Sequence, residues 1–387
     1  MTRHDIVCVG FNDWETELWT NQHHLMARLA GAGHRVLFIE SLGLRRPTVA
    51  GRDVSRMARR LVRGLQPPRE RDGVHVLSPL VIPLHGKAAV RAVNARLLPA
   101  LVGRAARKLG MSRPILWGYV PQAEALLDVL DPALVVYHCV DDIATQEGID
   151  EVSFRAAEAR FAGRADLVLA SAPRLAERMR TLSDNVLYAP NVADTAAFAT
   201  ALQGGPVDPA LAALPSPRLV FTGAIAEKKL DLPLLTAVAQ ARRDWTIALV
   251  GPVGLGDPHT DVAALDAEPN VHLLGARRYE ELPAVLRGAD VTLIPYRASE
   301  LTASIFPMKV YEYLAAGRPV VATPLPALEG VDAISVADGA DAFVSAVERE
   351  LAQDTPERRL ARSAAAAANS WDARLAEITA ELERLGG

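Results

Sequence analysis

Lys309 and Glu312 stand three residues apart, at the start of a helix that the sequence predicts after Pro307. Proline is favoured in a first helical turn, and residues three apart share one helix face. The pair is either an ordinary surface ion pair or a cation and a carboxylate that bind a diphosphate and a ribose diol. Gly317 ends the predicted helix, and a β-branched, buried strand follows it.

A second group of residues that could bind a ligand follows the predicted strand that ends at Gly223. Lys228 and Lys229 come shortly after this glycine and just before a helix. A glycine lets the backbone approach a phosphate closely, while a helix start and a lysine both favour negative charge. Lysines near helix starts are also common on ordinary surfaces, so this group alone leaves both interpretations open.

Strands and helices alternate along the chain and must position these residues. Predicted strands at residues 5–10, 35–40, 115–118, 134–139 and 167–170 precede a segment rich in glycine and proline, and a second series follows. Such βαβ series favour parallel, doubly wound sheets. We expect a domain at residues 1–200, a linker at 201–217, a second domain at 218–370 and a final helix at 371–387. Ligands bind at the carboxyl ends of such strands, so we expect a cleft between the domains.

Length and composition agree with two globular domains. The chain has 387 residues, of which 50% are hydrophobic and 23% charged, and this balance excludes disordered, collagen-like and disulfide-scaffold proteins. No apolar run is long enough to predict a transmembrane helix. The first residues lead directly into a strand, so we expect no secretory signal and a cytoplasmic location. Cys8 and Cys139 lie in strand-like runs and are expected to be buried free thiols.

Several enzyme classes are excluded by missing motifs. No glycine-rich dinucleotide motif follows the first strand, and the sequence contains neither a P-loop nor a serine-nucleophile elbow. The loop after that strand is instead bulky and polar, and includes Trp14, Gln22 and His23. These residues either pack as an aromatic helix entry or face a hydroxyl-rich acceptor.

Charge is distributed unevenly along a chain whose net charge is -4. From Arg45 to Lys108 the sequence holds 15 Lys or Arg residues and three acidic residues, which makes this segment +12. The segment is either a solvated helix face or a surface that attracts an anionic membrane or a polyprenyl-phosphate acceptor. Few aromatic residues are interleaved with the cations, so we expect no nucleic-acid partner.

Residues 306–323 resemble the donor-binding signature of retaining GT-B glycosyltransferases of the family-four type. Within that family the segment is most similar to bacterial transferases of the teichuronic-acid and exopolysaccharide type. Nearly the whole chain takes part in the resemblance. Further matching motifs lie, in the family's order, at residues 166–171, 190–194, 221–231, 250–252 and 290–296.

The resemblance implies two Rossmann-like domains facing a cleft, with the last helix returning to the N-terminal domain. Glu312 matches the second glutamate of the family's E-x7-E element, which holds the donor ribose. Ser304 stands where the family often has the first glutamate, and Ala224 replaces an arginine of the diphosphate site. Lys228 or Lys229 matches the family's lysine.

The implied activity is transfer of a sugar from a nucleoside-diphosphate sugar to an acceptor hydroxyl with retention of configuration, without cofactor or metal. The catalytic candidates are His138, Asp141, Asp142, Lys229 and Lys309. The donor-binding candidates are Gly223, Lys228, Gly251, Pro252, Gly275, Tyr279, Tyr296, Ser304, Ile305, Phe306 and Glu312. The acceptor-side candidates are Trp14, Gln22 and His23.

Two other functions fit the same architecture. A catalytically silent, sugar-nucleotide-binding subunit would explain Ser304 and Ala224, whereas the presence of Lys309 and Glu312 favours an active transferase. A nucleotide-sugar 2-epimerase would need acid and base carboxylates in the cleft and no acceptor.

Overall fold

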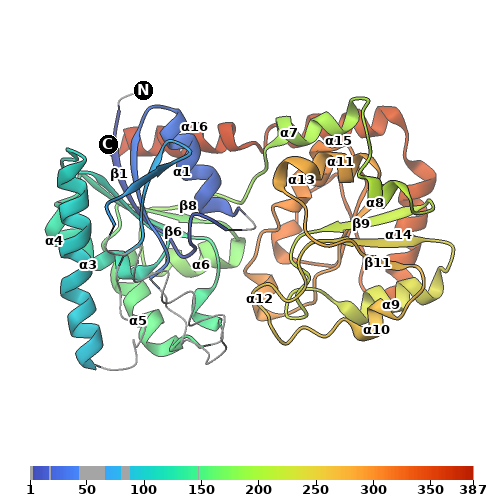
Figure 1. The fold of residues 1–387 in the computed structure, drawn as a ribbon, viewed down its shortest axis with the longest axis horizontal. Helices are drawn as coiled ribbons and strands as arrows, with labels where there is room; N and C mark the ends of the chain where they lie inside the picture. The colour runs from blue at the N-terminus through green and yellow to red at the C-terminus, as the bar shows by residue number, and fades with distance from the viewer. Residues whose placement is uncertain (1–2, 17–18, 43–65, 80–87, 147, 387) are drawn as a thin grey trace. The chain divides into compact units, whose positions relative to one another are not determined.

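The computed structural model describes residues 3–16, 19–42, 66–79, 88–146 and 148–386. The chain divides into two compact units (Figure 1). Unit 1 consists of Met1–Pro190 together with Leu375–Gly387, and unit 2 consists of Asn191–Arg374. Each unit is built around a largely parallel β-sheet, as the alternating pattern predicts.

The sheet of unit 1 has the strand order β3-β4-β2-β1-β5-β6-β7-β8 within the described residues. All neighbouring strands are parallel except β3 and β4. The order reverses between β1 and β5, which makes this the topological switch point of unit 1. The strands are β1 (Asp5–Val9), β2 (Arg35–Ile39), β3 (Arg69–Arg71), β4 (Val74–Leu77), β5 (Ile115–Gly118), β6 (Leu134–Cys139), β7 (Leu167–Ala170) and β8 (Val186–Tyr188).

Helices cover this sheet and bury their apolar sides. The helices of unit 1 are α1 (Asn21–Gly31), α3 (Ala88–Lys108), η1 (Pro121–Leu126), α4 (Leu127–Leu130), η2 (Ile143–Thr145), α5 (Glu151–Ala162) and α6 (Pro173–Arg180). Helix α1 packs against β2 and β4, and α6 packs against β7 and β8. Leu98 and Val102 bury one side of α3 in the core.

The sheet of unit 2 has the order β11-β10-β9-β12-β13-β14 and is parallel throughout the described residues. Its switch point lies between β9 and β12. The strands are β9 (Arg218–Thr222), β10 (Thr246–Val250), β11 (Val271–Leu273), β12 (Val291–Ile294), β13 (Val320–Ala322) and β14 (Ser335–Val336).

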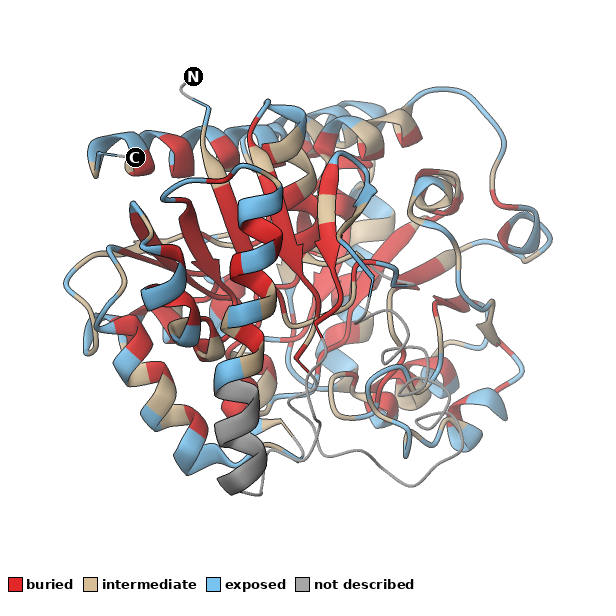
Figure 2. Ribbon diagram, turned by 60° about the vertical axis from the view of Figure 1, so that its left-hand side comes forward, coloured by how far each residue is buried: buried red, intermediate tan, exposed pale blue. Residues whose placement is uncertain are grey.

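The strands of unit 2 bury side chains on both faces, because successive residues of a strand point to opposite sides. Phe221 and Leu249 belong to a large core on one face, while Val220 and Ala248 belong to a smaller core on the other. The strands of unit 2 are therefore buried along most of their length. The strands of unit 1, which lie at the front in Figure 2, are red for the same reason. The helices are α7 (Thr195–Ala199), η3 (Thr200–Leu202), α8 (Pro209–Ala212), α9 (Leu232–Ala241), α10 (Ala263–Asp266), η4 (Tyr279–Glu281), α11 (Leu282–Arg287), α12 (Glu300–Ala303), α13 (Lys309–Ala315), η5 (Pro326–Leu328), α14 (Ala340–Gln353) and α15 (Pro356–Ala367).

The structure places the boundary of unit 2 earlier than the sequence predicts. Residues 201–217, expected to form a linker, lie inside unit 2. The reason is hydrophobic: Leu211 of α8 is fully buried in the same core as Val220 and Val285. Helix α16 (Trp371–Arg384) starts in unit 2, and from Leu375 onward it belongs to unit 1.

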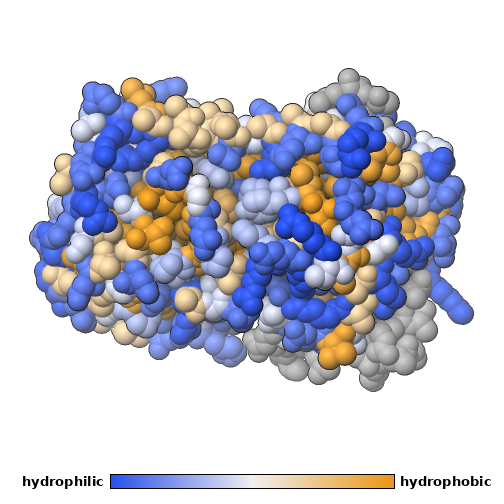
Figure 3. All heavy atoms as spheres, turned by 180° about the vertical axis from the view of Figure 1, so that it is seen from behind, coloured by the Kyte–Doolittle hydropathy of each residue, from blue (hydrophilic) through white to orange (hydrophobic). Residues whose placement is uncertain are grey.

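The surface carries no single apolar belt on the face seen in Figure 3, where orange areas are separated by hydrophilic residues. No helix in the described part of the chain is both long and apolar enough to cross a bilayer. Cys8 and Cys139 are free and buried, and burial raises the pKa of both thiols. The densest part of the predicted basic segment, up to residue 65, lies outside the described residues.

The close approach of two loops tests this fold. A Cβ atom on Gly251 would lie 1.9 Å from the carbonyl oxygen of Gly223, a backbone atom. We expect Gly251→Ala to separate the ends of β9 and β10 and to lower the free energy of unfolding by about 3 kcal/mol. Chemical denaturation measures this loss. Gly204→Ala is the matched control because no atom lies near its Cβ position; equal stability of both variants would contradict the predicted clash.

Candidate functional site

The carboxyl ends of β9 and β12 diverge at the switch point of unit 2. The two strands pair only at Val291–Leu219 and Thr292–Val220. Beyond this point the N–H of Thr222 donates to the hydroxyl oxygen of Tyr313 at 2.8 Å. The Thr222 hydroxyl lies 3.2 Å from the same phenol oxygen. The Tyr313 hydroxyl from α13 therefore serves as the hydrogen-bond partner that the Thr222 N–H would otherwise find on β12, and its side chain lies between the two strand ends.

Two glycine loops flank this opening. The Gly223 N–H donates to the carbonyl of Val250 at 2.8 Å, so the chain after β9 lies against the end of β10. Gly223 has φ of +126°, which L side chains rarely adopt, and its missing side chain leaves room for Lys309. The predicted glycine positions thus bring two stretches of backbone without side chains together at the edge of the sheet, with Gly223 half-buried and Gly251 buried.

Lys309 enters the opening from the first turn of α13. Its ammonium donates to the Tyr296 hydroxyl at 3.2 Å and lies 5.3 Å from the centre of the Phe221 ring. A Cβ on Gly223 would lie 3.1 Å from the Lys309 ammonium. Burial alone would lower the pKa of Lys309, but the Tyr296, Tyr313 and Glu312 oxygens more than offset it and the pKa is raised. Lys309 is therefore a permanent cation.

Glu312 lies one turn along the same helix and is 8% exposed. Its carboxylate has no hydrogen bond or ion pair with any residue that the structure describes. Burial raises the pKa of Glu312 to about 7, although the charge of Lys309 lowers it. A buried carboxylate without a protein partner is expected to need one from a ligand. The predicted pair is therefore not a surface ion pair.

The two lysines after Gly223 have different surroundings. The Lys228 ammonium donates to the carbonyl of Gly256, which holds it on a neighbouring loop. Lys229 is half-buried, and the structure shows no partner for its ammonium in the described part of the chain. The backbone of Lys229 accepts from the N–H of Arg297 at 2.8 Å, so this lysine belongs to the same sheet edge as Tyr296. Lys229 is the better placed of the two for a ligand.

The start of α9 does not offer a free helix end. The carboxylate of Asp231 accepts from the N–H of Leu234 at 2.9 Å and caps the helix. The sequence predicts that this helix start helps to attract a phosphate. In the structure the Asp231 carboxylate already occupies that position, so glycine backbone and lysine side chains are the groups left for an anion.

Most of the other predicted donor-binding residues of unit 2 are packed inside the protein around the site. Ser304, Ile305 and Phe306 are buried, and the Phe306 ring stacks on Tyr311 with ring centres 5.5 Å apart. Tyr279 packs edge-on against Phe198 at 5.4 Å. Two candidates lie in loops. Gly275 is exposed and has φ of +72°. The carbonyl of Pro252 accepts a hydrogen bond from the N–H of Ile225 at 2.9 Å.

The catalytic candidates His138, Asp141 and Asp142 belong to unit 1, at the carboxyl end of β6. His138 is buried and its ring stacks on Tyr119 with centres 4.8 Å apart. The Tyr119 hydroxyl donates to the Asn21 side chain at 2.9 Å. Buried polar groups thus gather near the switch point of this unit.

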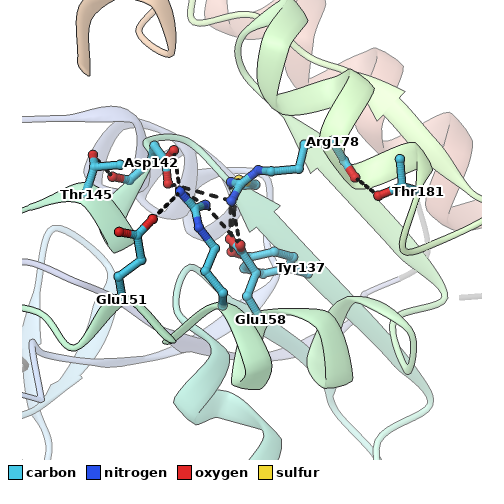
Figure 4. A network of polar contacts seen from close by, with 9 residues as sticks. Tyr137, Asp142, Thr145, Glu151, Glu158, Arg178 and Thr181 are labelled. Atoms are coloured by element: carbon cyan, nitrogen blue, oxygen red, sulfur yellow. Dashed lines mark hydrogen bonds and ion pairs between the residues drawn. The ribbon is translucent and has the colours of Figure 1, made fainter. Parts of the chain in front are cut away.

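Asp142 is held in an ion-pair network (Figure 4). Its carboxylate lies 2.7 Å from Arg155 and 3.6 Å from Arg178. Glu158, 2% exposed, accepts from Tyr137 at 2.6 Å and from Arg178 at 2.8 Å. Glu151 also lies 3.4 Å from Arg155, so three carboxylates share two guanidinium groups in this cluster. These contacts hold Asp142 in the network, and a catalytic role for Asp141 or Asp142 stays a prediction.

The three acceptor-side candidates are buried in unit 1. Trp14 donates from its backbone to Glu40 at 2.9 Å and from its indole to Asp72 at 3.0 Å. Gln22 accepts from the Phe11 N–H at 3.0 Å. His23 lies 3.0 Å from the Asp13 carbonyl, and burial lowers the pKa of this imidazole. In the structure these residues organise the loop after β1, and an acceptor role for them stays a prediction.

Tyr313 and Arg297 are site residues that the sequence analysis missed. Tyr313 is four residues after Lys309, and this spacing places both on one helix face. Arg297 follows Tyr296 directly, is exposed and adds a cation at the same edge. The i,i+4 spacing was available in the sequence, whereas the position of Arg297 depends on the pairing of Leu230 with Tyr296.

Two Rossmann-like α/β units in tandem define the GT-B fold. The chain has this fold, and it superposes on sucrose-phosphate synthase from Thermosynechococcus elongatus with a TM-score of 0.68 and 17% identity, covering 99% of both chains. HepE from Anabaena in complex with UDP-glucose superposes with a TM-score of 0.68 and 16% identity, covering 99% of this chain and 100% of HepE. A glycosyltransferase from Rickettsia africae superposes with a TM-score of 0.69 and 14% identity, covering 100% of this chain and 99% of that one.

The part of the chain that carries the site matches a known family. Residues 216–353 match the family described as Glycosyl transferases group 1. A putative teichuronic acid biosynthesis glycosyltransferase, TuaH of Bacillus subtilis, is 33% identical over 145 residues. That similarity spans 36% of this chain and 36% of the length of TuaH.

The unpaired carboxylate of Glu312 makes the free energy of unfolding depend on pH. Because the pKa of Glu312 is about 7 in the folded chain, above its ordinary 4.5, its ionisation costs stability as pH rises through this window. We expect Glu312→Gln to raise the free energy of unfolding by about 3 kcal/mol at pH 8, and by about 1 kcal/mol or less at pH 5. Denaturation at both pH values, with the exposed Glu329→Gln as control, measures the difference. A gain that does not depend on pH would contradict the assignment.

Proposed function

We propose that the protein is a glycosyltransferase that moves a sugar from a nucleoside-diphosphate sugar to an acceptor hydroxyl. The observation that carries this proposal is the site of unit 2, where a permanent cation and an unpartnered carboxylate enter one opening beside glycine backbone. Lys309 and Lys229 suit a diphosphate, and Glu312 suits a ribose diol. The match of residues 216–353 to a glycosyltransferase family supports the same function.

The reaction breaks the bond between the sugar C1 and the diphosphate oxygen and forms a bond from C1 to the acceptor oxygen. The acceptor hydroxyl loses its proton, which leaves with the nucleoside diphosphate or passes to solvent. Negative charge grows on the leaving diphosphate, so a preformed cation such as Lys309 lowers the barrier. We propose retention of configuration and no metal, because the residues on the diphosphate side are themselves cations.

A UDP-sugar donor and a role in cell-surface polysaccharide or glycolipid synthesis are further parts of the proposal. HepE, which shares the fold, was captured with UDP-glucose, and TuaH is named for teichuronic acid biosynthesis. Ser304 and Ala224 differ from the family pattern, and they are therefore the positions where donor choice is expected to differ.

Lys309→Ala and Glu312→Ala test the donor site. Each removes a group that a nucleoside-diphosphate sugar would bind, so we expect at least about tenfold weaker binding without unfolding. Calorimetric titration with UDP-, GDP- and dTDP-sugars measures the affinity, with Arg349→Ala, an exposed residue of α14, as control. Unchanged affinity in both site variants would remove the assignment.

Turnover separates the proposed activity from the two alternatives. Transfer of the donor sugar to membrane lipid or to a soluble acceptor supports the transferase. Interconversion of the donor at C2 without an acceptor would instead identify an epimerase, and binding without any turnover would identify a silent subunit.

Helix α3 supports an anionic or membrane-attached acceptor. Its sequence contains five cations and no acidic residue, and Arg96, Arg104, Arg107 and Lys108 are exposed. Leu98 and Val102 are buried on the opposite side, so the cations form the outer face of the helix. We propose that this face attracts an anionic lipid surface, which would bring a lipid-linked acceptor to unit 1.

Charge reversal on α3 tests this contact. We expect a variant with Arg104→Glu, Arg107→Glu and Lys108→Glu to bind vesicles of phosphatidylglycerol and phosphatidylcholine on the order of a hundredfold more weakly than the unmodified chain. Flotation assays measure binding, and Arg278→Glu with Arg349→Glu and Arg358→Glu, on unit 2, is the matched control. Equal loss in both triple variants would mean that only total charge matters.

A further inference from the structure

Lys309 and Glu312 carry opposite charges three residues apart on α13, yet they do not form an ion pair with each other. Residues at this spacing are neighbours on a helix surface, and opposite charges there normally attract. Both groups are removed from most of the solvent, which strengthens that attraction. Something in the site must therefore hold the two charges apart.

Tyr296 is the hydrogen-bond partner of the Lys309 ammonium in the structure. Its hydroxyl accepts from the Lys309 ammonium at 3.2 Å, and its ring centre lies 5.7 Å from the same nitrogen. The backbone of Tyr296 is fixed on two sides. Its carbonyl accepts from the Thr323 hydroxyl at 2.5 Å, and its backbone pairs with Leu230.

We infer that Tyr296 is a positioning residue that keeps Lys309 on the diphosphate side of the site and prevents it from neutralising Glu312. The inference rests on the proposed donor site and deepens it. With the phenol present, the ammonium is directed to Gly223 and the carboxylate remains open to a ribose diol. Without the phenol, the nearest anion to Lys309 on the helix is Glu312. The two side chains would then pair with each other, and neither would be available to the donor.

The groups that face this pair come from three elements. Tyr296 follows β12, Tyr313 lies on α13 and Phe221 with Thr222 ends β9. Of these, the Tyr313 hydroxyl is held by the Thr222 N–H, and burial raises the pKa of Tyr313 to about 12. Lys309 is the charged group that acts on Glu312, so the ionisation of Glu312 reports where the ammonium lies.

Tyr296→Phe tests the inference because it removes only the hydroxyl. The probe is UDP-glucose, whose diphosphate, unlike the terminal phosphate of free UDP, has no ionisation near pH 6. In the unmodified chain we expect affinity to rise as Glu312 ionises near pH 7. In the variant we expect about tenfold weaker binding at pH 8 and a midpoint at least about one pH unit lower, because pairing with Lys309 favours the carboxylate.

Three variants separate positioning from a general structural effect. Tyr311→Phe, on the same helix but stacked on Phe306, should keep the midpoint of the unmodified chain. Tyr296→Gln retains an acceptor for the ammonium and should restore the midpoint, and it also serves if the phenylalanine variant does not fold. In a Lys309→Met background, Tyr296→Phe should no longer shift the midpoint, because the residue acts through Lys309.

The outcomes distinguish this inference from the proposed function. Failure of the unmodified chain to bind UDP-glucose would overturn the donor site and the inference together. Binding by the unmodified chain with an unchanged midpoint in Tyr296→Phe would overturn the inference alone. A shift of the same size in Tyr311→Phe would also overturn it.

Discussion

A single hydrogen bond, from the Thr222 N–H to the Tyr313 hydroxyl, allows the central strands of unit 2 to separate. A buried strand edge without a partner would be costly, because its backbone groups lose water and gain nothing. The phenol replaces the missing backbone partner at the point where β9 leaves β12. The opening beside Gly223 is stable for this reason, and the helix that supplies the phenol also supplies Lys309 and Glu312.

The two units use buried charge in opposite ways. In unit 1, Asp142 and Glu158 are matched by Arg155 and Arg178, so the cluster is satisfied within the protein. In unit 2, Glu312 is buried without such a partner. A satisfied network rigidifies a fold, whereas an unsatisfied group creates a demand that a ligand can meet. Burial is common to Glu158 and Glu312, and it is their hydrogen-bond and ion-pair partners that distinguish the two roles.

Much of the fold follows from the sequence, because alternating apolar strands and amphipathic helices have few parallel solutions. The expected Lys309 and Glu312 lie on one helix, as their spacing requires. The position of unit 2's boundary was not predictable, since a segment rich in glycine and proline gives no sign that Leu211 is buried. Likewise, the ion pairs of Asp142 depend on how α5 and α6 pack, because Arg155 and Arg178 share no local motif with it. The local pattern of apolar residues predicts the helices and strands, but the side-chain partners of a residue depend on how those elements pack.

Asp231 has a consequence for how an anion would be held. Because its carboxylate caps α9, the fixed dipole of that helix is already compensated at its first turn. Attraction at this edge then depends on side-chain cations, of which Lys229 is half-buried and Arg297 exposed. Charges in contact with solvent are screened by salt, with a Debye length of about 8 Å at physiological ionic strength. The attraction from Lys229 and Arg297 is therefore expected to weaken as ionic strength rises, whereas the buried Lys309 is screened much less.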